Sequence, residues 1–109
     1  MSRLMIDVIR MIVYISTMIR SFFCKDTRLL FEGGNPRRFR AIKAQAERKL
    51  QMLDSATDII DLRSPPGNRL EKLSGDRSNQ WSIRINQQWR ICFSFTDGHT
   101  TDVEIVDYH

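Results

Sequence analysis

The sequence predicts an α+β fold, in which two N-terminal helices pack on a small twisted antiparallel β-sheet. Two patterns support this prediction. In the first half of the chain, apolar residues recur every three or four positions, the period of an amphipathic helix. After about residue 70, apolar and polar residues alternate in SIRIN, WRICFSF and TDVEIVD, the period of a half-buried strand. Helices followed by several short strands are typical of a layered α+β domain.

The size and composition indicate one domain with a modest core. The chain has 109 residues, of which 41% are hydrophobic, and its net charge is +4. A sequence pI near 9.5 favours polyanionic partners without specifying one. The two cysteines, Cys24 and Cys92, have neither CxxC spacing nor a His/Cys cluster around them. We therefore expect a reducing compartment, no metal and no cofactor, with Cys92 as a small buried residue.

Residues 1–17 are strongly apolar, and we expect them to be an extension outside the domain. A membrane-spanning helix needs about 20 apolar residues, and Asp7 and Arg10 interrupt this segment. No A-x-A-like cleavage site follows, so a signal peptide fits poorly. Met18 begins MIRSFF, which looks like a natural start, so an upstream start site explains the extension. An amphipathic helix on a membrane or a partner is the alternative.

A short strand and a short helix are expected first in the domain, which we place at residues 18–109. Residues 18–24, MIRSFFC, favour a strand. Asp26 can then cap the start of a helix, and Gly33-Gly34 can end it.

A longer amphipathic helix is expected over about residues 36–55, with Pro36 in its first turn. Its apolar stripe consists of Phe39, Ile42, Ala46, Leu50 and Leu53. The opposite face carries Arg37, Arg38, Arg40, Lys43, Arg48 and Lys49, offset only by Glu47. That face is either an ordinary solvated surface or a stripe that follows RNA phosphates. The next stretch, DLRSPPGNRL, predicts a loop because Pro65, Pro66 and Gly67 break helices.

The apolar faces of the strands set their register. Trp81, Ile83 and Ile85 form the apolar face of one strand. The odd-numbered residues from Trp89 to Phe95 form the apolar face of the following strand. A three-residue loop, Asn86-Gln87-Gln88, pairs Ile85 with Trp89 and keeps the apolar residues of both strands on the same side of the sheet. It also places Arg84 directly opposite Arg90 on the polar face.

Two arginines placed opposite each other destabilise a sheet, and a core does not require them. An anion bound between them would convert the repulsion into binding. Alternatively, both arginines are solvated and pair with Glu104 or Asp102 in the next strand.

The last hairpin is predicted at Asp97-Gly98. Matching apolar faces then pairs Phe93 with Val103 and Ile91 with Ile105, and Arg90 faces Val106. In this register Asp107, Tyr108 and His109 run alongside Trp89 and the 86–88 loop, close to Arg84 and Arg90.

This predicted cluster fits RNA cleavage by proton transfer. The reaction needs a base for the 2′-hydroxyl, a cation for the charge that develops on phosphorus, and an acid for the 5′-oxygen. His109 suits either proton role near neutral pH, and Tyr108 can stack on a base or hold the ribose. The alternatives are an exposed histidine without a role and an aromatic ring that covers the sheet edge.

The stretch LRSPPGNRLEKLSGDRSNQWSIRINQQWRICFSF, followed by VEIVDYH, resembles the HigB toxins of the RelE/ParE superfamily, the toxin halves of type II toxin–antitoxin pairs. MIRSF at residues 18–22 and AERKLQMLD at residues 46–54 resemble the family too, so the resemblance covers residues 18–109. It implies a RelE-like, microbial-ribonuclease-like fold and metal-independent cleavage of mRNA in the ribosomal A site, in the cytoplasm. It also implies a HigA-type helix-turn-helix antitoxin, through which the pair would contact its operator DNA.

The resemblance also implies roles for single residues. Arg90 matches the arginine that holds the scissile phosphate. Asp107, Tyr108 and His109 match the C-terminal catalytic group, with His109 as the leading proton-transfer residue. Where relatives often place another basic or imidazole group, this chain has Glu71 and Ser74, so Arg69 or Glu71 could serve instead. The implied phosphate- and RNA-binding residues are Arg84, Arg69, Lys72, Gln88, Arg37, Arg38 and Lys43.

Two other functions remain open at this point. The superfamily includes ParE toxins, which inhibit DNA gyrase, and the fold alone does not separate the two activities. An inactive toxin that acts only as a co-repressor with its antitoxin is the second alternative. The arginine pair and His109 favour ribonuclease activity, because a gyrase inhibitor needs neither.

Overall fold

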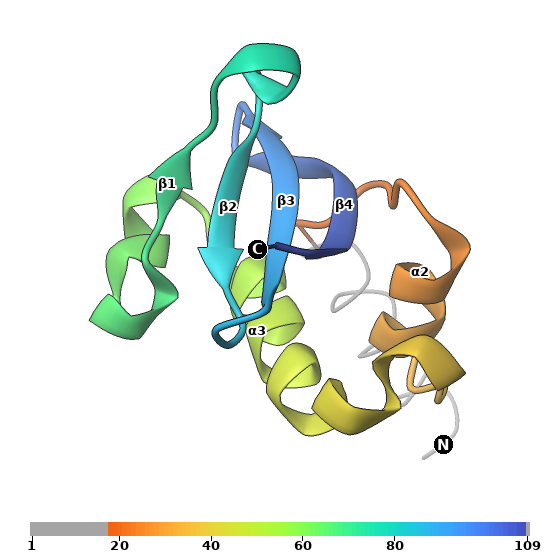
Figure 1. Ribbon diagram of the computed structural model, residues 1–109. Helices are drawn as coiled ribbons and strands as arrows, with labels where there is room; N and C mark the ends of the chain where they lie inside the picture. The colour runs from red at the N-terminus through yellow and green to blue at the C-terminus, as the bar shows by residue number, and fades with distance from the viewer. Residues whose placement is uncertain (1–17, 109) are drawn as a thin grey trace, which may run out of the picture.

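A four-stranded antiparallel sheet forms the centre of the fold in the computed structural model, which describes residues 18–108 (Figure 1). The strands lie in the order of the chain and comprise β1 (Glu71–Lys72), β2 (Trp81–Arg84), β3 (Trp89–Thr96) and β4 (His99–Asp107). The predicted α+β class and the meander are therefore confirmed. The predicted extension, residues 1–17, and the candidate His109 lie outside the described residues.

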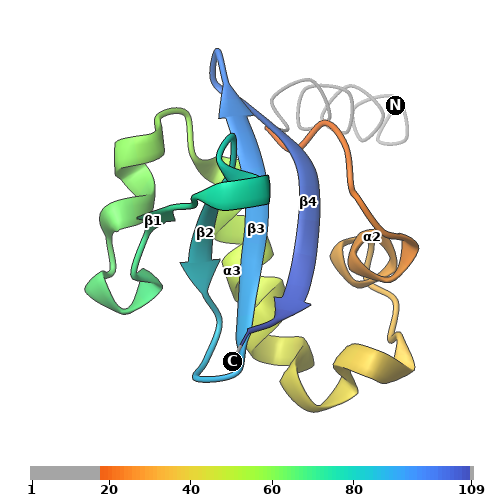
Figure 2. The ribbon, with the colours of Figure 1, turned by 45° about the horizontal axis from the view of Figure 1, so that its top comes forward.

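Helices precede the sheet in the chain: α2 (Lys25–Phe31), the 3-10 helix η1 (Arg37–Ile42) and α3 (Lys43–Ser55). Figure 2 shows α3 running along one face of the sheet and α2 lying beside β4. Cys24, and not Asp26, occupies the N-cap position of α2, and Asp26 lies in the first turn, where a negative charge is still favourable. Gly33 adopts a φ of 97° just after the helix, as predicted for its end. No helix within residues 18–108 is long and apolar enough to cross a membrane.

The helix predicted over residues 36–55 consists of two helices. Phe39 and Ile42 are three residues apart, which matches the three residues per turn of a 3-10 helix, and both are buried. From Ile42 onward the buried positions follow the α-helical period. Ile42 itself has φ −115° and ψ 12°, so the backbone leaves helical geometry where the two helices meet.

The core lies between α3 and the odd-numbered face of the sheet. Ala46, Leu50 and Leu53 of α3 are fully buried against it. The sheet contributes Ile83, Ile91, Phe93, Val103 and Ile105, all fully buried. The even-numbered residues therefore face the other side of the sheet, away from α3.

The predicted register is correct around the arginine pair. Arg84 lies opposite Arg90, and on the other side Arg90 pairs with Val106. Ile91 pairs with Ile105, also as predicted. The hairpin turn at Asp97-Gly98 is formed, with positive φ at both residues.

The predicted register fails beyond Cys92. A bulge shifts the pairing by one residue, so Ser94 lies opposite Thr101 and the predicted Phe93–Val103 pair falls inside the irregularity. Asp102 adopts a φ of 55° there, and its amide donates a hydrogen bond to the Ser21 hydroxyl at 2.9 Å. Val103 and Ile105 keep the two-residue spacing, so the alternation did not reveal the extra residue in β4.

The predicted strand at residues 18–24 is wrong as a continuous strand. This segment makes two isolated parallel bridges to β4, between Ile19 and Thr100 and between Phe22 and Val103. It therefore covers the outer edge of β4 (Figure 1). At its start the amides of Met18 and Ile19 each donate to the Asp54 carboxylate of α3 at 3.0 Å.

The predicted loop before the sheet contains two short 3-10 helices, η2 (Ile59–Arg63) and η3 (Pro66–Asn68). Asn68 is fully buried, and its side-chain amide donates to the Leu62 carbonyl at 3.1 Å. Its carbonyl oxygen accepts a 2.5 Å hydrogen bond from Lys49 Nζ. Desolvation by burial, with a further contribution from Arg48, lowers the pKa of Lys49. Lys49 therefore links α3 to this loop through its hydrogen bond, and it is not part of an exposed basic surface.

Candidate active site

Arg90 lies on the even-numbered face near the start of β3, and it is only 8% exposed. Its Nε donates to the Ser82 hydroxyl at 2.9 Å. Its Nη2 donates to the backbone oxygens of Arg69 at 2.7 Å and of Ser82 at 3.4 Å. Nη1 makes no hydrogen bond to any of residues 18–108. The guanidinium is therefore held in place through two nitrogens, while the third can donate to a bound phosphate.

Tyr108 packs over this guanidinium. The Arg90 Cζ atom lies 5.6 Å from the centroid of the Tyr108 ring, a cation–π distance. After β4 the chain turns back across β3 (Figure 1), and the Tyr108 amide donates to the Gln88 carbonyl at 2.6 Å. Tyr108 is 43% exposed, so it remains accessible from solvent. The chain thus places an aromatic surface directly beside the Arg90 guanidinium, as expected from the register.

The loop between β2 and β3 joins the remaining polar candidates. The Asn86 side-chain oxygen accepts hydrogen bonds from the amides of Gln88 and Trp89, at 2.8 and 2.9 Å. Arg84 Nε donates to the Asn86 carbonyl at 3.0 Å, and Gln88 Nε2 donates to Asp107 Oδ2 at 3.2 Å. The structure therefore brings Arg84, Gln88, Arg90, Asp107 and Tyr108 to one end of the even-numbered face.

The segment before β1 contributes a backbone group to the site. Arg69 adopts a φ of 45°, and its carbonyl accepts the hydrogen bond from Arg90, whereas its side chain is exposed. Lys72 lies opposite Trp81 in the sheet, and its Nζ lies 5.0 Å from the centroid of the Trp81 ring. Trp81 belongs to the odd-numbered face, so the structure does not bring Lys72 to Arg90.

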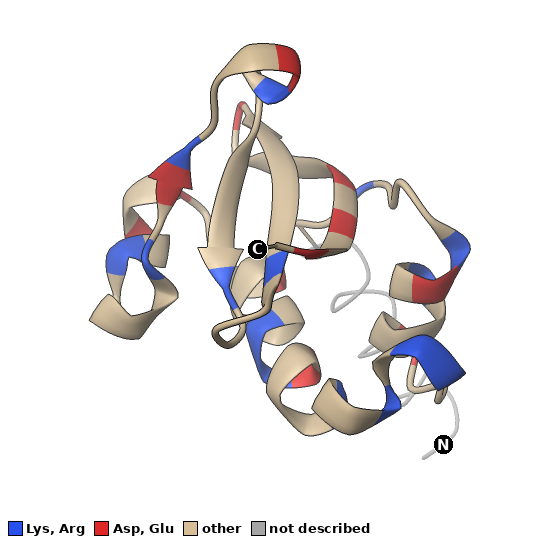
Figure 3. Cartoon of the chain, viewed as in Figure 1, with Lys and Arg blue, Asp and Glu red and all other residues tan. Residues whose placement is uncertain are grey.

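Other basic residues lie on η1 and α3, the helical layer behind the sheet in this view (Figure 3). The Arg38 Cζ atom lies 5.8 Å from the centroid of the Trp89 ring, so this exposed cation reaches the end of β3 from the opposite face. Arg37 is exposed, and Lys43 forms an ion pair with Glu47 at 3.6 Å. These residues form a surface separate from the arginine pair.

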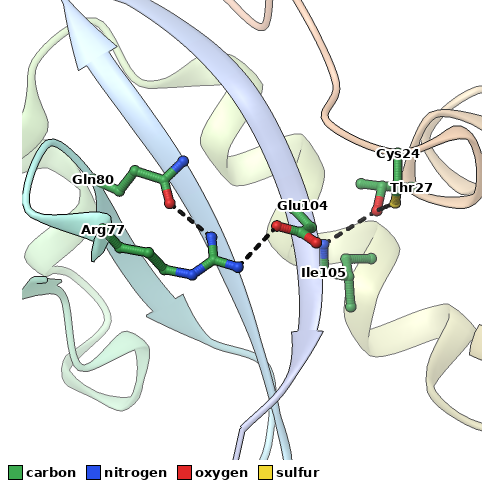
Figure 4. Close-up of polar contacts among 6 residues, drawn as sticks. All are labelled: Cys24, Thr27, Arg77, Gln80, Glu104 and Ile105. Carbon is green, nitrogen blue, oxygen red and sulfur yellow. Dashed lines mark hydrogen bonds and ion pairs between the residues drawn. The ribbon is translucent and has the colours of Figure 1, made fainter. Parts of the chain in front are cut away.

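One ion pair that the sequence did not predict holds the segment before β2 over the sheet (Figure 4). Arg77, in the 3-10 helix η4 (Gly75–Arg77), donates through Nη2 to Glu104 Oε1 at 3.1 Å and through Nη1 to Gln80 Oε1 at 2.8 Å. The alternative in which Arg84 and Arg90 pair with Glu104 or Asp102 is therefore wrong. The available signal was Glu104 itself, a carboxylate on the face that the alternation assigned to Arg90.

The even-numbered face of the sheet is buried beneath the segment that contains η4. Cys92 is fully buried, as predicted, and burial raises the pKa of its thiol. On the far edge of β4, the Ile105 amide donates to the Thr27 hydroxyl at 3.1 Å, and Cys24 Sγ lies 3.0 Å from that hydroxyl (Figure 4). Contacts along both edges therefore fix β4 just before Asp107 and Tyr108 in the chain.

The arrangement suits phosphate chemistry carried by side chains. It combines a buried, preorganised cation with an exposed aromatic ring and carboxylates. Among residues 18–108, no group of three or more His, Cys, Asp or Glu side chains is placed to hold a metal ion. His109, the predicted proton-transfer residue, follows Tyr108 in the chain and lies outside the described residues.

Comparisons with known proteins identify one family for this chain. Residues 20–109 match the family described as RelE-like toxin of type II toxin–antitoxin system HigB. Endoribonuclease HigB of Proteus vulgaris is 38% identical over 96 residues, which cover 84% of this chain and 100% of that protein. Toxin HigB-1 of Vibrio cholerae is 51% identical over 51 residues, which cover 47% of this chain and 54% of that protein.

A solved structure shows the same fold. The YoeB–YefM complex from Staphylococcus aureus contains a chain that aligns with a TM-score of 0.50 at 17% identity. The alignment covers 84% of this chain and 97% of that chain.

Proposed function

The chain belongs to the HigB-like family of RelE-like toxins of type II toxin–antitoxin systems, and from this premise we propose that it is an endoribonuclease that cleaves mRNA on the ribosome. The observation that carries the proposal is the state of Arg90. A guanidinium that is 8% exposed and bonded through two nitrogens keeps its third nitrogen for a phosphate oxygen. The name Endoribonuclease HigB of the Proteus vulgaris relative supports the same reaction.

In this proposal each residue of the site has a separate task. Arg90 binds the scissile phosphate and stabilises the charge that develops on it. Tyr108 stacks on a base or holds the ribose, and Gln88 and Asp107 fix the polypeptide around it. His109 transfers a proton. Arg84 attracts the neighbouring phosphate, because no carboxylate of residues 18–108 forms an ion pair with it.

The exposed cations serve binding in this proposal. Arg37 and Arg38 would contact ribosomal RNA, with Lys43 and the side chain of Arg69 adding charge at the margins. Such contacts release counterions, so affinity for the ribosome falls steeply as salt concentration rises. Lys72 would bind RNA only from the face opposite Arg90.

The proposed partner is a HigA-type helix-turn-helix antitoxin, in keeping with the toxin–antitoxin family of the chain. Contact with operator DNA would run mainly through that antitoxin. The YoeB–YefM complex supports an antitoxin partner for proteins of this fold. Because the proposed substrate is mRNA under translation, we place the activity in the cytoplasm.

Primer extension on a reporter mRNA, with and without translating ribosomes, tests the proposed function. We expect codon-phased cuts only when purified protein and ribosomes are both present, and none after addition of the antitoxin. Cuts without ribosomes would instead indicate a free ribonuclease. Growth arrest without any cuts would indicate gyrase inhibition. Neither cuts nor growth arrest would indicate a protein that acts only with its antitoxin.

We further propose that residues 1–17 are dispensable for folding and cleavage. The Asp54 carboxylate already holds the amides of Met18 and Ile19, and a chain that starts at Met18 would present an α-ammonium group to the same carboxylate. We expect residues 18–109 to melt within about 4 °C of the full chain and to cleave at the same rate. Thermal unfolding and primer extension on both proteins check this, and an unstable or inactive shorter protein would contradict it.

A further inference from the structure

We propose that the outer face of α2, together with Phe23 directly before it, is the surface on which the proposed antitoxin docks through an acidic, amphipathic segment. The inference rests on the antitoxin partner named above and adds the surface and the chemistry of the contact. Three features carry it: exposed apolar side chains at α2, exposed cations between them, and the concentration of positive charge in this part of the chain.

Exposed apolar side chains lie at both ends of α2. Four large apolar residues among residues 18–108 are exposed: Phe23, Leu29, Ile60 and Tyr108. Tyr108 packs on Arg90, and Ile60 belongs to η2. Phe23 is 68% exposed just before α2, and Leu29 is 37% exposed in its last turn, so a helix only about 10 Å long separates them. Exposed apolar side chains that lie this close together are typical of a protein interface.

The backbone holds both apolar residues at fixed positions. The Phe23 amide donates to the Val103 carbonyl of β4 at 2.9 Å, and the Leu29 carbonyl accepts from the Gly34 amide at 2.8 Å. A Cβ at residue 34 would lie only 2.9 Å from that carbonyl oxygen, so the close return of the chain requires glycine. Leu30 is 1% exposed and anchors α2 in the core. A partner therefore meets side chains whose backbone is already ordered, which lowers the entropic cost of docking.

Two cations lie between these apolar residues. Lys25, Arg28 and Leu29 are spaced three and four residues apart, so they share one face of the helix. Lys25 and Arg28 are exposed, and no carboxylate of residues 18–108 forms an ion pair with either of them. Apolar contacts surrounded by a polar rim are the usual composition of a protein–protein interface. Carboxylates of a partner can thus pair with the two cations while its apolar side chains cover Leu29 and Phe23.

The positive charge of the chain is concentrated in the same region. Residues 18–43, which include α2 and η1, contain seven Lys or Arg and two Asp or Glu. Residues 44–109 contain eight Lys or Arg and ten Asp or Glu. Figure 3 shows the basic segments of α2 and η1 on the same side of the molecule. This asymmetry steers an acidic partner toward α2 and disfavours a basic one.

The side chains of this surface favour a protein segment over RNA. Surfaces that bind single-stranded RNA combine cations with aromatic rings on which bases stack. Leu29 is aliphatic and offers a nucleotide neither stacking nor a hydrogen bond, but it packs well against apolar side chains. The occupant is therefore a segment with carboxylates beside an apolar face, and the antitoxin is the protein partner that the toxin–antitoxin family implies.

The docking surface is separate from the arginine site. Figure 2 shows α2 beyond β4 as seen from β3, the strand that carries Arg90. Substitutions at α2 can therefore change antitoxin binding without touching the groups proposed to cleave mRNA. This separation makes the inference testable independently of the ribonuclease function.

Binding of the full chain to the HigA-type antitoxin, measured by surface plasmon resonance, tests the docking surface. We expect Phe23→Ala and Leu29→Ala each to weaken binding by about 10-fold or more, the usual effect of removing an apolar anchor from an interface. Arg28→Gln should weaken binding and reduce its dependence on salt, because a charge pair across the interface is lost. All three variants should cleave mRNA on ribosomes at the wild-type rate.

Two substitutions in η2 are the matched controls. Ile60 is 61% exposed and Arg63 is exposed, so they resemble Phe23 and Arg28 in chemistry and accessibility. Ile60→Ala and Arg63→Gln should bind the antitoxin like the wild type. Every variant changes an exposed side chain and should melt within about 4 °C of the wild type, so that a loss of binding reports on the surface and not on folding.

Wild-type affinity of both Phe23→Ala and Leu29→Ala would overturn the docking surface and leave the ribonuclease proposal intact. Unchanged antitoxin affinity with weakened ribosome binding would overturn it in favour of RNA. A wild-type dimer that these variants dissociate, with antitoxin affinity unchanged, would assign the face to a second copy of the chain. Weakened antitoxin binding by variants of a protein that cuts no mRNA would support the docking surface and contradict the ribonuclease proposal. A wild-type chain that binds no antitoxin would overturn both the partner and its surface.

Discussion

Arg90→Lys is expected to reduce mRNA cleavage by about 100-fold or more, because one donor in a preorganised anion site is typically worth that much. Lysine retains the positive charge but has one compact ammonium group. It cannot bond to Ser82, to the Arg69 carbonyl and to a phosphate in the fixed geometry of a guanidinium. The measurement is the single-turnover cleavage rate on ribosomes, together with growth arrest when the variant is expressed without antitoxin.

Arg90→Ala should abolish growth arrest while antitoxin binding is preserved. Its stability needs a separate check, because removal of the guanidinium leaves the buried Ser82 hydroxyl and the Arg69 carbonyl without their donor. A buried group left without its partner, such as the Ser82 hydroxyl, costs about 1–3 kcal/mol of folding free energy. Arg63→Lys is the matched control, since Arg63 is exposed in η2 and lies outside the site. Full toxicity of both Arg90 variants would show that the phosphate lies elsewhere.

His109→Gln is expected to lower cleavage by about 100- to 10,000-fold, the range of a lost proton-transfer group. The residue follows Tyr108, whose ring packs on the Arg90 guanidinium and whose amide is bonded to Gln88. Glutamine keeps a polar side chain of similar size but cannot donate a proton to a leaving 5′-oxygen. Deletion of His109 should likewise abolish growth arrest and leave antitoxin binding intact.

The chain supplies its own control for this substitution. Its other histidine, His99, is exposed at the opposite end of β4, beside the Asp97-Gly98 turn. His99→Gln should therefore cleave like the wild type. If His109→Gln and His99→Gln were equally active, proton transfer would not involve His109. Persistent growth arrest by a cleavage-deficient His109 variant would instead direct attention to gyrase.

The alternation of apolar residues determined much of the site without any tertiary information. A one-residue shift in pairing would turn Ile83 or Ile91 from the core to solvent, so burial selects one register. That register places Arg84 opposite Arg90 and Val106 beside Arg90. The Asp97-Gly98 turn was also predictable, because few residue pairs accept positive φ at both positions.

The tertiary structure alone decided which polar groups from distant parts of the chain meet. The Arg69 carbonyl, the Arg77–Glu104 ion pair and the bond from Lys49 to Asn68 all join residues at least 19 positions apart in the chain. The bulge at Asp102 likewise depends on the neighbouring 18–24 segment, through Ser21. Periodicity reports the face on which a side chain lies, but it does not report which distant segment covers that face. The partners of a long polar side chain follow from that covering segment, and this is why Arg90 was predictable from the sequence and its hydrogen bonds were not.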